Sequence, residues 1–98
     1  MHNFKELKIW QKSMELVSDV YQASLNMPKS QQYSLVDQIQ RSAVSIPSNI
    51  AEGSGRGTNN EFVRFLNISN GSCCELETQL LIAQNLNFLE KETAVNMI

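Results

Sequence analysis

The segment EGSGRG at residues 52–57 is the part of this chain most similar to a phosphate-binding loop. Such a loop follows a strand and carries a lysine beside a serine or threonine, because these groups contact the phosphates and a metal ion. Here the glycines follow a helical pattern and no lysine is near. We interpret them as a helix end with left-handed glycines. An anion site stays open as an alternative, since Arg56 precedes the N-terminus of the next predicted helix.

Cys73 and Cys74 are the only cysteines, and His2 is the only histidine. A disulfide between adjacent cysteines is strained, and a zinc site needs about four ligands. We therefore predict two reduced thiols, one in the core and one near its edge, and no metal site. We draw no Ser–His–Asp triad, because the only candidate base is His2, and one histidine cannot supply the paired Glu-x-x-His motifs of a di-iron bundle. We expect no catalytic residues, no enzymatic activity and no cofactor.

The charge balance is slightly acidic, since eight Lys and Arg face ten Asp and Glu and give a net charge of −2. This argues against a nucleic-acid binder held by bulk positive charge. The length of 98 residues predicts a single domain, 1–98, and 42% hydrophobic residues exclude a disordered chain. We see no signal sequence and no apolar stretch that could span a bilayer, so we expect a cytoplasmic protein without membrane contact.

Apolar residues recur at helical spacing over residues 4–25, which predicts a first amphipathic helix. Its expected core face consists of Leu7, Trp10, Met14, Val17, Tyr21 and Leu25. A second helix is expected to begin at a Ser30 cap and to bend at Pro47 before the glycines end it. A strand over residues 43–50 is the weaker alternative, because Pro47 would break a central strand.

Thr58 and Glu61 have capping-box spacing, which predicts a third helix that runs to about Leu86. A helix of this length measures roughly 43 Å, so we expect an elongated molecule. Residues 90–98 begin a fourth helix that stops after about two turns. The predicted fold class is therefore all-α, an antiparallel up-and-down four-helix bundle with a short or truncated fourth helix.

Three long helices and one short helix cannot close a four-helix core. The apolar face that stays open must contact a partner chain or a continuation of the fourth helix. The apolar residues Val95, Met97 and Ile98, with no helix cap after them, favour a continuation.

If the second and third helices are antiparallel neighbours joined by a turn at about position 56, small side chains of the two helices lie at the same height along the bundle. Ser42 and Ser45 then lie near the level of Ser69 and Gly71, which allows close backbone approach and hydroxyl hydrogen bonds. Gly71 in mid-helix costs about 1 kcal/mol relative to alanine, so we expect it to have a packing reason. A tight crossing within the chain and an oligomer interface or ligand contact are both open interpretations.

Arg41, Arg56 and Arg64 are the isolated positive residues on or beside these two helices. Each can be solvated, can pair with a nearby acidic group such as Glu61 on the helix of Arg64, or can contact a phosphate. The aromatic residues fall on predicted core faces, so platforms for base stacking are missing.

Three blocks, at residues 4–21, 38–56 and 61–80, resemble a known family. The second contains the specific run SIPSNIAEGSGR. The chain is similar over about residues 4–89 to the bacterial four-helix-bundle proteins encoded in intervening sequences of 23S rRNA genes. The accessory variability protein of diversity-generating retroelements is a relative of that family. The resemblance implies an up-and-down bundle assembled as a homopentamer, and no catalysis.

In the retroelement branch, the resemblance also implies binding to nucleic acid and to a nucleic-acid-processing protein through positive surface. Carried over to this chain, the basic positions are Arg41, Arg56 and Arg64. The chain departs from the pattern at Gln40 and Asn70, where relatives often have basic residues.

Overall fold

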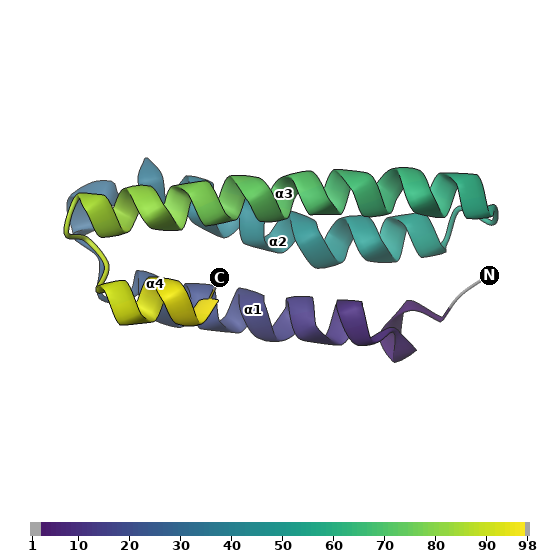
Figure 1. Cartoon of the computed structure of the whole chain (residues 1–98), viewed down its shortest axis with the longest axis horizontal. Helices are drawn as coiled ribbons and strands as arrows, with labels where there is room; N and C mark the ends of the chain where they lie inside the picture. The colour runs from purple at the N-terminus through teal and green to yellow at the C-terminus, as the bar shows by residue number, and fades with distance from the viewer. Residues whose placement is uncertain (1–2, 98) are drawn as a thin grey trace.

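The structure, a computed structural model, describes residues 3–97 apart from the side chain at position 95, so His2 and Ile98 lie outside it. The described elements are α1 (Lys8–Ser24), α2 (Leu35–Ser54), α3 (Asn59–Asn85) and α4 (Lys91–Met97), with 3-10 turns at Phe4–Glu6 and Lys29–Gln31. The three long helices run up and down, and α4 returns along part of α1 (Figure 1). No strand occurs in the described range, and the molecule extends 43 × 20 × 19 Å. The predicted all-α, elongated bundle with a short fourth helix is confirmed.

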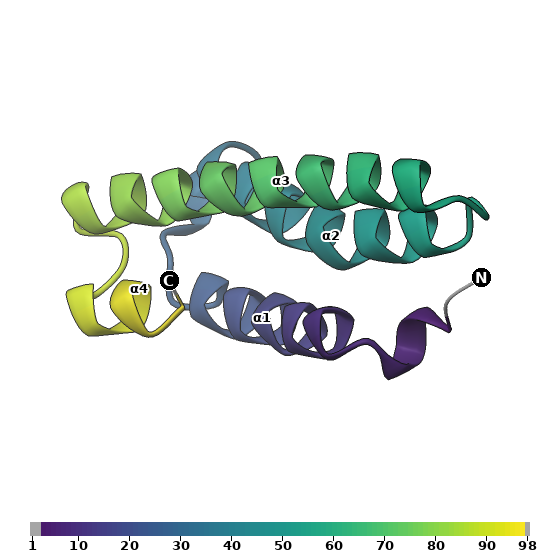
Figure 2. The ribbon, with the colours of Figure 1, turned by 45° about the vertical axis from the view of Figure 1, so that its right-hand side comes forward.

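The central element of the bundle is α2. It packs against α3 and, on another side, against α1, whereas no Cα atom of α1 lies within 8 Å of one in α3. The short α4 occupies the fourth position, beside the ends of both α1 and α3 (Figure 2). The three long helices therefore form a trough that α4 covers at one end only.

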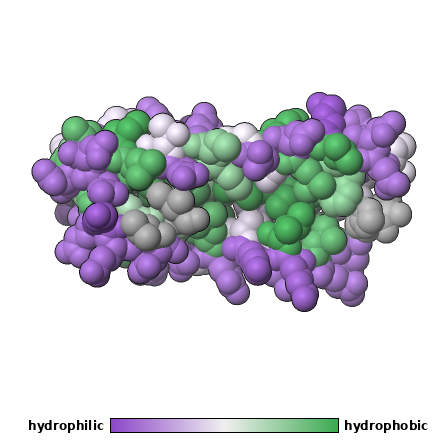
Figure 3. Space-filling model, viewed as in Figure 1, coloured by the Kyte–Doolittle hydropathy of each residue, from purple (hydrophilic) through white to green (hydrophobic). Residues whose placement is uncertain are grey.

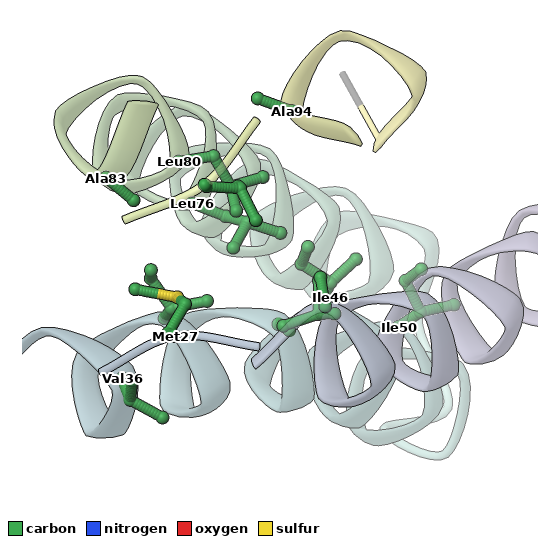
Figure 4. Close-up of a cluster of buried hydrophobic side chains, with 13 residues drawn as sticks. Met27, Val36, Ile46, Ile50, Leu76, Leu80, Ala83 and Ala94 are labelled. Atoms are coloured by element: carbon green, nitrogen blue, oxygen red, sulfur yellow. The ribbon is translucent and has the colours of Figure 1, made fainter. Parts of the chain in front are cut away.

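The core is made of aliphatic side chains from all four helices, among which Val20, Ile39 and Leu80 are the largest fully buried ones. Leu76 and Leu80 of α3 point toward Met27 of the α1–α2 connection (Figure 4). Ala94 of α4, with none of its surface exposed, completes this end of the core. None of the described helices is long and apolar enough to cross a membrane.

The predicted core face of α1 is wrong at Met14, Tyr21 and Leu25, whose side chains are 44%, 43% and 78% exposed. The buried positions of α1 are instead centred on Ser13 and Val20. Burial of Ser13 is possible because its hydroxyl donates to the carbonyl oxygen of Trp10 at 2.7 Å. Apolar spacing alone did not identify this face, since small polar residues line it.

Ser30 does not cap α2, which begins at Leu35. Residues 28–34 form consecutive backbone turns, in which the amide of Gln31 donates to the carbonyl of Pro28 at 2.9 Å. The helix then continues through Pro47, so a strand over residues 43–50 is excluded. The predicted bend at Pro47 stays a prediction.

Both ends of α3 agree with the prediction to within one or two residues. The hydroxyl of Thr58 accepts a hydrogen bond from the amide of Glu61 at 3.2 Å, as expected for an N-cap. At the other end, Asn87 has a φ of 62°, and the amide of Phe88 donates to the carbonyl of Ala83 at 2.8 Å. A left-handed residue with such a bond is the usual way to satisfy the last carbonyls of a helix.

Candidate nucleic-acid interface

The glycine-rich turn between α2 and α3 positions the candidate interface. α2 continues through Gly53 to Ser54, and Gly55 is its C-cap with a φ of −87°, so the helix ends among these glycines as predicted. Of the described glycines, only Gly57 has a positive φ, at 90°. The prediction of left-handed glycines is therefore confirmed at one position and wrong at the others.

Gly53 has a packing role instead. A Cβ atom at this position would lie 2.5 Å from Cβ of Phe65 and 3.3 Å from Cδ1 of Phe62. Cβ of Phe65 is fixed to the backbone, so it cannot move away without moving α3. The close approach of α2 and α3 thus requires glycine at position 53.

Arg56 and Arg64 lie together over the ring of Phe65. Their guanidinium carbons are 4.9 and 4.5 Å from the ring centroid, within the range of a cation–π contact. Phe65 itself is buried, with 8% of its surface exposed, while both arginines are about half exposed. Contact with one rigid ring brings together two positive groups that lie eight residues apart in the sequence.

Each of these two arginines has an acidic partner on its own helical segment. Arg56 pairs with Glu52 at 2.8 Å, and Arg64 pairs with Glu61 at 2.7 Å. The hydrogen bond from Arg64 holds the pKa of Glu61 below its ordinary value, and the charges of Arg64 and Arg56 act in the same direction. The cluster of four side chains therefore has no formal net charge, and an anion that binds here must compete with two carboxylates.

Arg41 does not belong to this cluster. It lies fifteen residues before Arg56, which along a helix is roughly 22 Å at 1.5 Å per residue. Its side chain is 80% exposed and pairs with Asp37 at 3.0 Å. Of the three predicted nucleic-acid-binding residues, the structure brings together only Arg56 and Arg64.

The predicted contact of small residues between α2 and α3 is confirmed at Ser69, but Ser42 bonds at the height of Glu75, not at that of Ser69, and Gly71 makes no such contact. Ser69 is buried and donates to the carbonyl of Ile46 on α2 at 3.0 Å, and Ser42 donates to a carboxylate oxygen of Glu75 at 3.3 Å. These pairs place the turn about two residues later than position 56.

Ser45 donates within its own helix to the carbonyl of Ser42 at 2.9 Å. Gly71 is exposed, and a Cβ atom there would meet no described atom within 4 Å. Within the chain Gly71 therefore makes no tight crossing.

Both Cys73 and Cys74 are exposed free thiols, so the prediction of one core thiol is wrong. Cys73 faces the trough between α1 and α3, and partial burial there, with the neighbouring Cys74, raises the pKa of its thiol. In the described range, no group of three His, Cys, Asp or Glu side chains could hold a metal ion.

A family model for the 23S rRNA-intervening sequence protein matches residues 5–98, nearly the whole chain. The chain belongs to this family. The match includes Arg56, Arg64 and all of α4. It also includes the α2–α3 seam, the contact between these two helices that contains Ser42 and Ser69. No curated protein matches the chain.

One feature of this site could not be predicted from the sequence, and a second could have been but was missed. Phe65 was assigned to the core, which is correct, but its ring also contacts both arginines. The pairing of Arg56 with Glu52 has the i, i+4 spacing of helical ion pairs and was detectable from that spacing.

Proposed function

We propose that this protein is a non-enzymatic, homo-oligomeric helical scaffold that binds structured RNA through the turn between α2 and α3. The observation that carries this proposal is the gathering of Arg56 and Arg64 over Phe65, in a chain of the 23S rRNA-intervening sequence protein family. Guanidinium groups suit phosphate oxygens because their donors match them in pairs.

The energetics favour modest, salt-sensitive binding. Each arginine exchanges an exposed carboxylate for a phosphate, and exposed ion pairs contribute only about 0–1 kcal/mol. The gain then comes mainly from release of counterions from the RNA, which makes affinity fall with log salt concentration.

The test is binding of a structured RNA hairpin by fluorescence anisotropy at about 50 to 200 mM salt. We expect the double substitution Arg56→Ala and Arg64→Ala to weaken binding at least tenfold and to reduce the log–log salt slope by about two. Arg41→Ala is the matched control, since its arginine is also exposed and ion-paired but lies away from the turn; it should change affinity less. Absence of RNA binding by the wild-type chain at 50 mM salt would remove this proposal.

The second candidate is a protein–protein assembly module with no nucleic-acid role. The net charge of −2 and the pairing of each arginine with a carboxylate favour it. So do Met14, Tyr21 and Val44, which are 40–44% exposed on α1 and α2. Light scattering of the purified chain measures the assembly that both candidates require, with a homopentamer expected from the family resemblance, and a stable monomer would count against both.

A further inference from the structure

A polar cavity lies at the end of the bundle that α4 covers, where the chain passes from α3 into α4. It encloses about 620 Å³, within the range of roughly 300–1,000 Å³ that is typical of ligand pockets. Its walls come from the end of α1, the end of α3 and the first residues of α4, all within residues 23–93. Figure 3 shows hydrophilic surface at the left end of the molecule, where α4 begins, whereas apolar surface lies in the right half, between α3 and α1.

Three carboxamide side chains line this cavity. Asn26 follows α1, Gln84 belongs to the last turn of α3, and Asn87 lies in the α3–α4 connection. Backbone hydrogen bonds hold their positions, because the amide of Asn26 donates to the carbonyl of Ala23 at 3.2 Å and that of Asn87 to the carbonyl of Gln84 at 3.0 Å. None of the three side chains forms a hydrogen bond within the described range. The carboxamides are therefore available to pair with a ligand.

The walls also contain an aromatic ring and one charge of each sign. Phe88 contributes a partly buried ring, Glu90 a carboxylate and Lys91 an ammonium group. The two charged side chains are exposed, and neither has an ion-pair partner among residues 3–97. A ligand can therefore use both charges without displacing a partner within this part of the chain.

This set of groups argues against several classes of ligand. An apolar molecule would cover the carboxamides and leave them without hydrogen bonds, which costs free energy. A simple anion attracted by Lys91 would be repelled by its neighbour Glu90. In the part of the chain that the structure describes, no group of three His, Cys, Asp or Glu side chains could hold a metal ion. The cavity instead suits a planar polar molecule that carries both hydroxyl groups and a negative charge.

An adenine nucleotide has a counterpart for each of these groups. The edge of adenine carries an amino donor beside a ring-nitrogen acceptor, and the carboxamide of Asn or Gln matches both at once. Guanine presents two acceptors along the same edge, which a carboxamide matches less well. Aromatic side chains stack on bases, a carboxylate accepts hydrogen bonds from ribose hydroxyls, and lysine binds phosphate.

We propose that this cavity binds an adenine nucleotide, with its base on the carboxamides of Gln84 and Asn87 and its phosphate toward Lys91. The same chemistry is present in a free mononucleotide and in an unpaired adenosine of an RNA. This inference goes beyond the proposed function, because the cavity contains neither Arg56 nor Arg64 and lies at the other end of α3 from them (Figure 1).

The first experiment measures binding of AMP by isothermal titration calorimetry and compares it with IMP and adenosine. IMP replaces the exocyclic amino group by an oxygen, so the match to a carboxamide is lost, and we expect IMP to bind at least tenfold more weakly. Adenosine lacks the phosphate, so it should bind more weakly than AMP in the wild-type chain and equally in Lys91→Gln. Failure of AMP to bind, or equal binding of AMP and IMP, would overturn the proposal.

Variants of the carboxamides test the location. Asn87→Gly removes one carboxamide and keeps the backbone, because glycine readily adopts the left-handed conformation of Asn87, with its φ of 62°. Gln84→Glu keeps the size of the side chain but replaces its NH₂ donor by an oxygen. Together they should weaken AMP binding at least tenfold.

Asn96→Ala is the matched control, because Asn96 is an exposed carboxamide on α4 that lines a neighbouring depression and not this cavity. It should leave the affinity for AMP unchanged. Circular dichroism checks that all variants keep their helices. A loss of affinity in Asn96→Ala as large as in the double variant would contradict the assigned site.

Competition distinguishes the two sources of the nucleotide. If the ligand is an unpaired adenosine of RNA, a hairpin with one bulged adenosine should displace AMP, and the same hairpin with a bulged uridine should not. If neither hairpin displaces AMP, the ligand is a free mononucleotide. Equal displacement by both hairpins would contradict recognition of adenine and overturn the proposal.

The double substitution Arg56→Ala and Arg64→Ala separates this proposal from the proposed function. It removes the two arginines of the α2–α3 turn and no residue of the cavity. AMP should therefore bind to this variant as tightly as to the wild-type chain. Loss of AMP binding in this variant, with its helices intact, would contradict a site at the other end of α3.

Discussion

An apolar groove, lined by Ile9, Leu16 and Leu66, lies between α1 and α3. It shares Ile46 and Ser69 with the seam between α2 and α3, but the seam is closed and the groove is open. In the seam, Gly53 lets the backbones approach and Ser69 bonds to Ile46 across the helices. In the groove, Ile9 keeps 49% of its surface exposed. Both surfaces are apolar, so the difference depends on the number of helices available to cover them. An amphipathic helix in this bundle needs two neighbours, and α1 and α3 have only α2 along most of their length.

The two regions also differ in how their charges are balanced. Near the seam, Arg56 and Arg64 each have a carboxylate within 2.8 Å. In the groove, Lys12 has no ion-pair partner among the described residues. The closed region therefore pairs its charged groups within the chain, whereas Lys12 of the open region has no such pair among residues 3–97.

The largest expected effect comes from truncating one leucine in the closed core beneath α4 and one in the open groove. Leu80 is 2% exposed and contacts the core beneath α4, so Leu80→Ala should lower the free energy of unfolding by about 2–5 kcal/mol. Leu66 on the same helix is only partly buried in the open groove, so Leu66→Ala should cost about 1 kcal/mol. Urea denaturation of both variants measures the contrast. Equal losses would mean that the groove is as closed as the core beneath α4.

Closure of the seam can be tested at Gly53. Alanine at this position places a Cβ atom 2.5 Å from Cβ of Phe65, so α2 and α3 must move apart. We expect Gly53→Ala to lower the free energy of unfolding by about 1–3 kcal/mol, despite the better helix propensity of alanine. A gain in stability on urea denaturation would show that the seam has room.

Gly71 is the matched control on α3, because a Cβ atom there meets open space. Gly71→Ala should raise the free energy of unfolding by about 0.5–1 kcal/mol through reduced backbone entropy of the unfolded chain. Light scattering of the same variant sharpens the result. Loss of an oligomer in this variant would assign Gly71 to a contact between subunits and end the contrast with Gly53.

The sequence predicted the number and order of the helices and both ends of α3, because capping positions such as Thr58 are local signals, but it did not predict the start of α2 at Leu35. It did not predict which face of α1 is buried. Met14 and Tyr21 have the right spacing for a core, but Ser13 and Ala23 allow closer packing on α2, and only the partner helix decides between such neighbouring faces.

The roles of the glycines and the arginines were not predicted either, because they too depend on contacts with another helix. A sequence indicates that Gly53 and Gly71 are both helical, but the clash that makes one of them essential depends on the position of Phe65 on another helix. Likewise, the spacing of Arg56 and Arg64 does not reveal that one ring holds both. Ion pairs between residues three or four apart are the part of the site that local spacing predicts.

The smallest expected effect concerns the charge balance near the seam. The pKa of Glu61 lies below its ordinary value, mainly because Arg64 donates a hydrogen bond to it. A carboxyl with a lowered pKa in the folded state stabilises the fold above its ordinary pKa, and this contribution disappears as the pH falls through the folded value. Arg64→Gln should therefore raise the pKa of Glu61 toward its ordinary value.

Carbon-detected NMR titration of Glu61 measures this shift. Arg56→Gln is the matched control, because Arg56 acts on Glu61 only through its charge and its removal should raise that pKa less. An unchanged pKa in Arg64→Gln would mean that this arginine is not engaged by Glu61 in solution. The arginine would then be as free as Lys12, and the difference in charge balance between seam and groove would be lost.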